Sequence, residues 1–184
     1  MPNEVLLGLG NATGMFFHAP AGTKLPAGPF DTLDDAWTKA GDISEDGISF
    51  KMDRSTKDLK NWAAKVKRTI MEDHSETVDA PVMDTTEESL KTIFGASNVT
   101  KTAATSTASA KISVNMSASS LPDPEAYLFL MKDGDAGIML GCETGQITEI
   151  SDLDFTPSDG ITWKATIKGL EDGWTMVFDD GTKA

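Results

Sequence analysis

AYLFLMK (residues 126–132) and IMLGCETGQITEI (residues 138–150) are the stretch that decides the fold, with the turn residues Asp133-Gly134-Asp135 between them. Both segments are rich in aliphatic, β-branched and aromatic residues, which favour strands, and Asp-Gly sequences are typical of tight turns. The apolar run is strand-sized and far shorter than the roughly 18 residues that would span a bilayer. These residues therefore predict neighbouring strands in a mainly β protein.

Further strands are predicted on both sides of this stretch. Residues 102–110 are small and of low complexity, which indicates a flexible loop or a weakly specified strand. Together the segments give seven or eight strands, so we expect a β-sandwich or barrel-like sheet. The additional strand segments are Ile48–Asp53, Trp62–Ile70, Thr77–Met83, Lys111–Ser117, Ile161–Lys168 and Trp174–Phe178.

Alternation assigns faces to two of these strands. In the strand from Trp62, the residues Trp62, Ala64, Val66 and Ile70 share one face, and Arg68 falls on it, which predicts that Arg68 is paired or lies at an interface. In the strand from Lys111, the inward positions are Ile112, Val114 and Met116.

Two short helices are predicted. The first begins at Thr32 and stops at Gly41, and Leu33, Ala36, Trp37 and Ala40 form its apolar face. The second has Thr85 as its N-cap, Glu88 closing a capping box, and Gly95 as its stop. We expect one helix to flank the sheet, with the other as a second short helix.

The first 30 residues are rich in Gly, Pro and Ala, which predicts an extended N-terminal arm over residues 1–30 and a single β-sandwich domain over residues 31–184. Exposed aromatics in a free tail would promote aggregation. Met15, Phe16 and Phe17 must therefore either pack back on the domain or dock on a neighbouring copy.

Composition excludes several functions. Sixteen basic and 29 acidic residues give a formal charge of −13, which opposes sequence-independent nucleic-acid binding. The chain carries no secretory signal, so the cytoplasm is the default compartment, and nothing indicates a membrane partner. Cys142 is the single cysteine, and its apolar, Gly-rich surroundings predict a buried, unreactive thiol.

No catalytic, metal or cofactor site is predicted. His18 and His74 have no partner at the spacing of a metal site or a nucleophile. Turn chemistry explains the aspartate pairs, none of which continues into a calcium loop. These pairs are Asp133/Asp135, Asp152/Asp154 and Asp179/Asp180.

The first 70 residues or so resemble the major tail tube proteins of siphovirus-type long-tailed bacteriophages. The resemblance is carried by APAGTKLP (19–26), LDDAWTKAGDISEDGI (33–48) and DRSTKDLKNW (53–62), followed by the basic strand of residues 65–69. It implies a non-enzymatic subunit of the virion tail, with a β-sandwich and a flanking helix. Such subunits assemble in the host cytoplasm as hexameric rings that stack into a tube for genome ejection.

The resemblance also implies partners and surfaces. The partners are further copies of the chain and the tail tape measure, terminator and distal tail proteins, while phage DNA passes through the lumen without specific binding. The N-terminal arm and the loop over residues 44–61 would bridge subunits and rings. Candidate inter-subunit residues are Met15, Phe16, Phe17, Trp37, Asp53, Arg54, Lys57 and Arg68.

An acidic cluster is a candidate for the lumen, because negative charge keeps DNA from adhering. A plain solvated face is the alternative, and the more common use of such a cluster. The cluster consists of Glu72, Asp73, Glu76 and Asp79.

Two other classes of protein remain open from the residues alone. A monomeric β-sandwich carbohydrate-binding module would use Trp163 or Trp174 to stack on a sugar, although their alternation with apolar residues favours burial. An acidic β-sandwich hydrolase would need paired carboxylates, whose separation in space the sequence leaves open.

Overall fold

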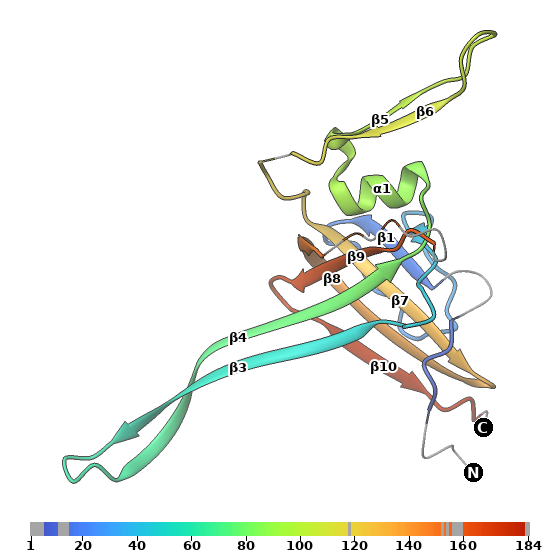
Figure 1. The fold of residues 1–184 in the computed structure, drawn as a ribbon. Helices are drawn as coiled ribbons and strands as arrows, with labels where there is room; N and C mark the ends of the chain where they lie inside the picture. Colours follow the sequence, from blue (N-terminus) through green and yellow to red (C-terminus); the bar gives the residue numbers. More distant parts are fainter. Residues whose placement is uncertain are drawn as a thin grey trace.

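The computed structural model describes residues 6–10, 15–117, 119–151, 153, 155 and 160–182. Eight of its strands form one antiparallel sheet in the order β2-β1-β7-β8-β9-β4-β3, with β10 beside β8, and β5 and β6 form a separate hairpin (Figure 1). The elements are β1 Phe16–Pro20, β2 Thr38–Gly41, β3 Ser49–Lys60, β4 Val66–Val82, α1 Glu87–Phe94, the 3-10 turn η1 Ala96–Asn98, β5 Val99–Thr102, β6 Lys111–Val114, β7 Glu125–Asp133, β8 Ala136–Ile150, β9 Trp163–Gly169 and β10 Thr175–Asp179.

Strand β7 is buried on both faces. Tyr127, Phe129 and Met131 belong to the larger hydrophobic cluster on one side of the sheet, and Leu128 and Leu130 belong to a smaller cluster on the other. A strand with two buried faces reads as a continuous apolar run instead of an alternating one. The unbroken run at residues 126–131 therefore places β7 in the interior of the sheet.

The larger cluster is built around stacked aromatic rings. Phe16 of β1 lies parallel to Phe129, with 4.6 Å between ring centroids. Helix α1 covers this side of the sheet, and its Phe94 meets Trp163 of β9 edge-on at 5.5 Å. These are the offset and edge-to-face arrangements that aromatic pairs prefer.

The smaller cluster is covered by the segment between β1 and β2 instead of by a helix. Leu25, Leu33 and Trp37 of this segment pack against Leu128 and its neighbours. The approach is close, because a Cβ added at Gly141 of β8 would lie 2.6 Å from Cδ2 of Leu25. Glycine at this position thus lets an irregular segment seal the second face.

Strand β8 joins two groups of strands. Its first half pairs with β7 on one side and with β10 on the other, and its second half pairs with β9. Residues of β1, β4, β7, β8 and β9 all contribute to the larger cluster, so the sheet curls around a shared core. The expected mainly β fold with a flanking helix is confirmed.

The helix predicted near residue 85 is confirmed, with its cap one residue later than expected. The Thr86 hydroxyl oxygen accepts a hydrogen bond from the Ser89 amide, and the Ser89 hydroxyl oxygen accepts one from the Thr86 amide. Thr85 instead accepts a bond from the indole nitrogen of Trp163. Gly95 ends the helix as predicted. Within the described residues, no helix is long and apolar enough to cross a membrane.

The helix predicted over residues 32–40 is wrong. Asp34 instead closes a single turn, accepting bonds from the amides of Ala36 and Trp37, and Thr38–Gly41 then joins the edge of β1 as β2. A helix this short is marginal by itself in water. A free sheet edge and a buried site for Trp37 outweigh it.

Two face assignments are also wrong. Trp62 and Ala64 lie in the turn between β3 and β4, and Trp62 is fully exposed. Ile112 and Met116 are exposed because β6 pairs only with β5, away from the main sheet. Residues 103–110 form the loop of that second hairpin, as expected of a low-complexity segment.

The end of the N-terminal segment packs back on the main sheet. Met15, Phe16 and Phe17 are all buried, and β1 pairs with both β7 and β2. The independence of residues 31–184 from residues 1–30 as a folding unit stays a prediction.

We expect Phe129→Ala to lower the free energy of unfolding by about 3–5 kcal/mol, because it opens a cavity beneath the Phe16 ring. Urea denaturation followed by circular dichroism measures the change. Phe178→Ala on β10, where the ring is 60% exposed, is the matched control and should cost under about 1 kcal/mol. Equal losses would contradict the central position of β7.

Candidate functional site

One hairpin projects beyond the main sheet. Strand β4 pairs with β9 only over Thr77–Val82, so its earlier residues have β3 as their sole neighbour. We call residues 52–76 the projecting hairpin, and nearly all of its side chains are exposed. Figure 1 shows it extending far from the body of the molecule.

The turn at the end of the hairpin is well defined. The amide of Asn61 donates to the carbonyl of Lys65, and the side-chain oxygen of Asn61 accepts from the amide of Lys65, both at 2.9 Å. Ala64 adopts a left-handed conformation with φ 58°. This turn leaves the Trp62 side chain fully exposed to solvent at the end of the hairpin.

The projecting hairpin carries five large apolar side chains that are exposed to solvent. A two-stranded hairpin by itself is at best marginally stable in water. Large exposed apolar groups on such an element mark an interaction surface. They are Met52, Leu59, Trp62, Val66 and Met71, with exposed fractions from 42% to full exposure.

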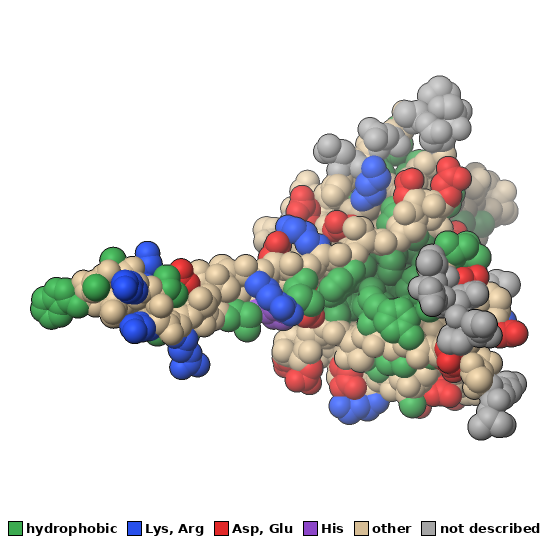
Figure 2. All heavy atoms as spheres, turned by 90° about the horizontal axis from the view of Figure 1, so that it is seen from below, with side chains coloured by type: hydrophobic (Ala, Val, Ile, Leu, Met, Phe, Trp, Pro, Cys, Tyr) green, Lys and Arg blue, Asp and Glu red, His purple; other side chains and the backbone are tan. Residues whose placement is uncertain are grey.

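The outer half of the hairpin is basic, unlike the rest of the protein. We call residues 57–68 the tip; five basic residues and one acidic residue give it a formal charge of +4. The remaining residues therefore carry −17, since the total is −13. Figure 2 shows blue side chains along the projection and mostly red ones on the body. The basic residues are Lys57, Lys60, Lys65, Lys67 and Arg68.

Few side-chain contacts stabilise the projection. Lys57 pairs with Glu72 at 3.2 Å, and Thr69 donates to Asp58 at 2.8 Å. Both contacts are exposed, and exposed pairs of this kind contribute about 0–1 kcal/mol. Within a single chain, the stability of the hairpin thus comes mainly from its backbone hydrogen bonds.

The predicted inter-subunit residues fall into two groups. Met15, Phe16, Phe17 and Trp37 are buried inside the chain and offer little surface to another molecule. The other four lie on the exposed projecting hairpin, and their role between subunits stays a prediction. These are Asp53, Arg54, Lys57 and Arg68.

The predicted acidic cluster is not a single patch. Glu76 shares a strand face with the buried Val78, pairs with His74 and accepts from the Trp174 amide. Asp79 lies on the opposite face and accepts from Thr166. Glu72 and Asp73 lie on the projecting hairpin. Their role in lining a lumen stays a prediction.

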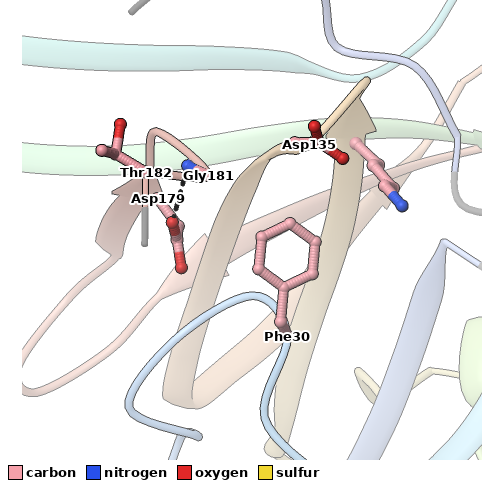
Figure 3. A pocket seen from close by; sticks show the side chains of 6 residues that line it. Phe30, Asp135, Asp179, Gly181 and Thr182 are labelled. Carbon is pink, nitrogen blue, oxygen red and sulfur yellow. Dashed lines mark hydrogen bonds between the residues drawn. The ribbon is translucent and has the colours of Figure 1, made fainter. Parts of the chain in front are cut away.

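A cavity of about 660 Å³ lies beside the turn between β7 and β8 and the end of β10 (Figure 3). It contains two carboxylates, Asp135 and Asp179, and the Asp179 side chain accepts from the amide of Gly181 at 2.9 Å. Asp135 is exposed and Asp179 half-exposed, unlike the desolvated acid that glycoside hydrolysis needs. The lining residues are Phe30, Lys132, Asp135, Asp179, Gly181 and Thr182. Asp152 and Asp154 lie outside the described residues.

The two tryptophans considered for sugar stacking are turned inward. Trp163 is buried, and Trp174 is half-buried with its ring 6.1 Å from that of Phe129. Sugar stacking requires an open ring face. Neither residue provides the platform that a carbohydrate-binding module would use.

Each histidine contacts a glutamate, and the cysteine is buried. His18 pairs with Glu125 at 3.0 Å, and His74 pairs with Glu76 at 3.1 Å. Cys142 is buried as predicted, and this burial raises the pKa of its thiol to about 12. Within the described part of the chain, no cluster of three or more His, Cys, Asp or Glu residues could hold a metal ion.

The sequence analysis included Lys57 and Arg68 of the tip among the candidate inter-subunit residues, but it missed the exposed position of Trp62 and the cavity. A signal for the tip exists: DRSTKDLK (53–60) is a strand segment with only one apolar residue, so it has no face to bury. The cavity had no such signal, because Phe30 and Asp179 are brought together only by the tertiary fold.

Comparisons with known proteins bear on this arrangement. A family model described as "Phage tail tube protein" matches residues 3–176 of the 184. No curated protein matches the chain.

We expect Trp62 to dominate quenching of tryptophan fluorescence by acrylamide in the isolated chain, because Trp37 and Trp163 are buried. Trp62→Phe should remove most of the quenchable emission and change the free energy of unfolding by no more than about 0.5 kcal/mol. Trp174→Phe is the comparison variant. Unchanged quenching in Trp62→Phe would show that the tip is covered within one chain.

Proposed function

Because the chain belongs to the phage tail tube protein family, we propose that it assembles into stacked hexameric rings whose central channel conducts the phage genome during ejection. The family match covers most of the chain and supports a structural role in the tail. The absence of an open stacking platform at Trp163 and Trp174 weakens the carbohydrate-binding alternative.

The observation that carries this proposal is the projecting hairpin. It exposes apolar side chains on the parts of β3 and β4 that have no third strand beside them. Assembly would cover these side chains and supply the contacts that a lone hairpin lacks. The unpaired edge of β3 is also available for strand addition by another copy.

The charge of the chain supports a conducting channel. A surface with net negative charge repels the phosphate backbone, and the repulsion extends over about 8–10 Å in physiological salt. Of the candidate lumen residues, Glu72, Asp73 and Asp79 are exposed, whereas Glu76 is held by hydrogen bonds at the base of the hairpin. We therefore propose Glu72, Asp73 and Asp79 as stronger candidates for lining the lumen than Glu76.

Further partners follow from a tube of defined length. We propose that the ends of the tube contact the tail terminator and distal tail proteins, and that its lumen encloses the tape measure protein before ejection. Assembly takes place in the host cytoplasm, and the finished tube belongs to the virion.

Electron microscopy of the purified protein at high concentration, with its mass from light scattering, tests the proposal. We expect rings or tubes with a central channel. Replacing residues 55–73 by Asn-Gly would join the register partners Arg54 and His74 through a two-residue turn and should leave a folded monomer. Circular dichroism of this variant would check that it is folded.

Trp62→Phe is the matched control for the shortened variant, because it keeps an aromatic side chain at the tip, and it should still assemble. Tubes formed by the shortened variant would contradict the role of the hairpin. A strictly monomeric wild-type chain at every concentration would contradict the proposed self-assembly.

A further inference from the structure

We infer that the hairpin tip of one copy docks into the cavity beside Phe30 in the next copy, with Trp62 inside the cavity and the tip lysines against Asp135 and Asp179. This inference rests on the proposed self-assembly and names the receptor for the tip. The occupant is a second copy of this chain.

The tip has the chemistry of an anchor. Trp62 is fully exposed on a turn that is closed by two hydrogen bonds between Asn61 and the backbone of Lys65. These bonds fix the conformation of the turn that carries Trp62. Lys60 and Lys65 flank it, and within the described residues neither makes an ion pair. Tryptophan is the residue type most enriched among the dominant contacts of protein interfaces. A surface that binds the tip should therefore offer an aromatic side chain to Trp62 and negative charge to the lysines.

The cavity provides both features. The Phe30 ring is 49% exposed, and Asp179 and Asp135 line the cavity on different sides of it (Figure 3). Among the lining residues that the structure describes, Lys132 is the one cation, and it lies over the Phe30 ring, 5.8 Å from its centroid. The carboxylates are therefore available to cations from outside.

Glycines hold these walls in place. A Cβ added at Gly137 would lie 2.7 Å from Cζ of Phe30, so this ring packs directly on the backbone of β8. A Cβ at Gly181 would collide with the backbone of Asp135, and Gly181 has φ 72°. The cavity is thus preformed, which lowers the entropic cost of docking.

The size of the cavity distinguishes it from the groove below α1. Pockets that take up a drug-sized group have volumes of about 300–1,000 Å³. The cavity beside Phe30 has about 660 Å³, whereas the groove lined by Ile93, Leu121 and Ile150 has about 170 Å³. The larger cavity also carries the two aspartates that complement the tip.

The positions of tip and cavity require two molecules. The tip lies at one extreme of the molecule, and the turn between β7 and β8 that carries Asp135 lies at the opposite side (Figure 1). A protrusion and a receptor at different places on the same subunit form a heterologous contact. Such contacts repeat head to tail and generate either a closed ring or a continuous filament, both of which a tube contains.

Disulfide cross-linking tests this contact directly. Ala63→Cys places a thiol beside Trp62, and Thr182→Cys places one on the cavity rim, in separate chains that differ by an affinity tag. The native Cys142 is buried and does not compete. A disulfide forms only when the two Cα atoms approach to about 4.4–6.8 Å. The matched acceptor control is Ser120→Cys, beside the groove below α1.

We expect mild oxidation of the mixed chains to give a mixed disulfide with Thr182→Cys and none with Ser120→Cys. Adding Trp62→Ala to the Ala63→Cys chain should weaken association about 30-fold or more, as expected for a dominant interface residue. A product with Ser120→Cys, or none with Thr182→Cys in a mixture that assembles by light scattering, would overturn the inference. The latter result would leave the proposed self-assembly intact, whereas absence of any assembly would refute both.

Charge reversal gives a second, independent readout. Lys60→Glu with Lys65→Glu in the tip, and Asp135→Lys with Asp179→Lys in the cavity, should each prevent association. In a 1:1 mixture of these two variants, every tip-to-cavity contact between unlike chains pairs opposite charges, so the mixture should associate with the two variants alternating. A single chain with all four changes should associate again. Failure of that chain to recover while it remains folded by circular dichroism would contradict the pairing of these charges.

Discussion

The close stacking of β7 between two hydrophobic clusters is the constraint on which the rest of the structure depends. Phe129 packs against Phe16 on one face, and Leu128 packs under the segment that carries Leu25 and Trp37 on the other. Because both faces are covered, β7 provides the rigid centre from which the neighbouring strands extend. The position of β8 beside β7 then determines where β9, β4 and the projecting hairpin begin.

This arrangement separates stability from assembly. The core is concentrated in the strands around β7 and under α1, whereas the projecting hairpin buries almost nothing in the single chain. In the proposed tube, contacts with other copies would supply the support that the hairpin lacks in a single chain. The opposite charges of the tip and the body favour encounters between copies, and steering of this kind acts more on association rate than on final affinity.

Local rules predicted the regular parts of the fold. Strands β7, β8 and β9 and helix α1 were found from apolar periodicity, turn residues and capping, because their neighbours in space satisfy the same preferences. The segment 32–40 shows where this fails. Its helical pattern is real, but Trp37 gains more by entering the smaller cluster while Thr38–Gly41 extends β1. For Trp62, alternation suggested a buried face that the tertiary structure does not supply.

By itself the sequence determined the mainly β class, the flanking helix, the negative charge and the buried Cys142, because these depend on composition and on contacts close along the chain. The candidate inter-subunit residues of the hairpin were also identified through family resemblance. Only the tertiary structure decided that residues 52–76 leave the sheet, that Trp62 lies at their end, and that Phe30, Asp135 and Asp179 share one cavity. These features depend on where β9 stops pairing with β4 and on segments distant in sequence meeting in space. The polar segment 53–60 signals only that the hairpin has no face to bury, not where it projects or what it meets.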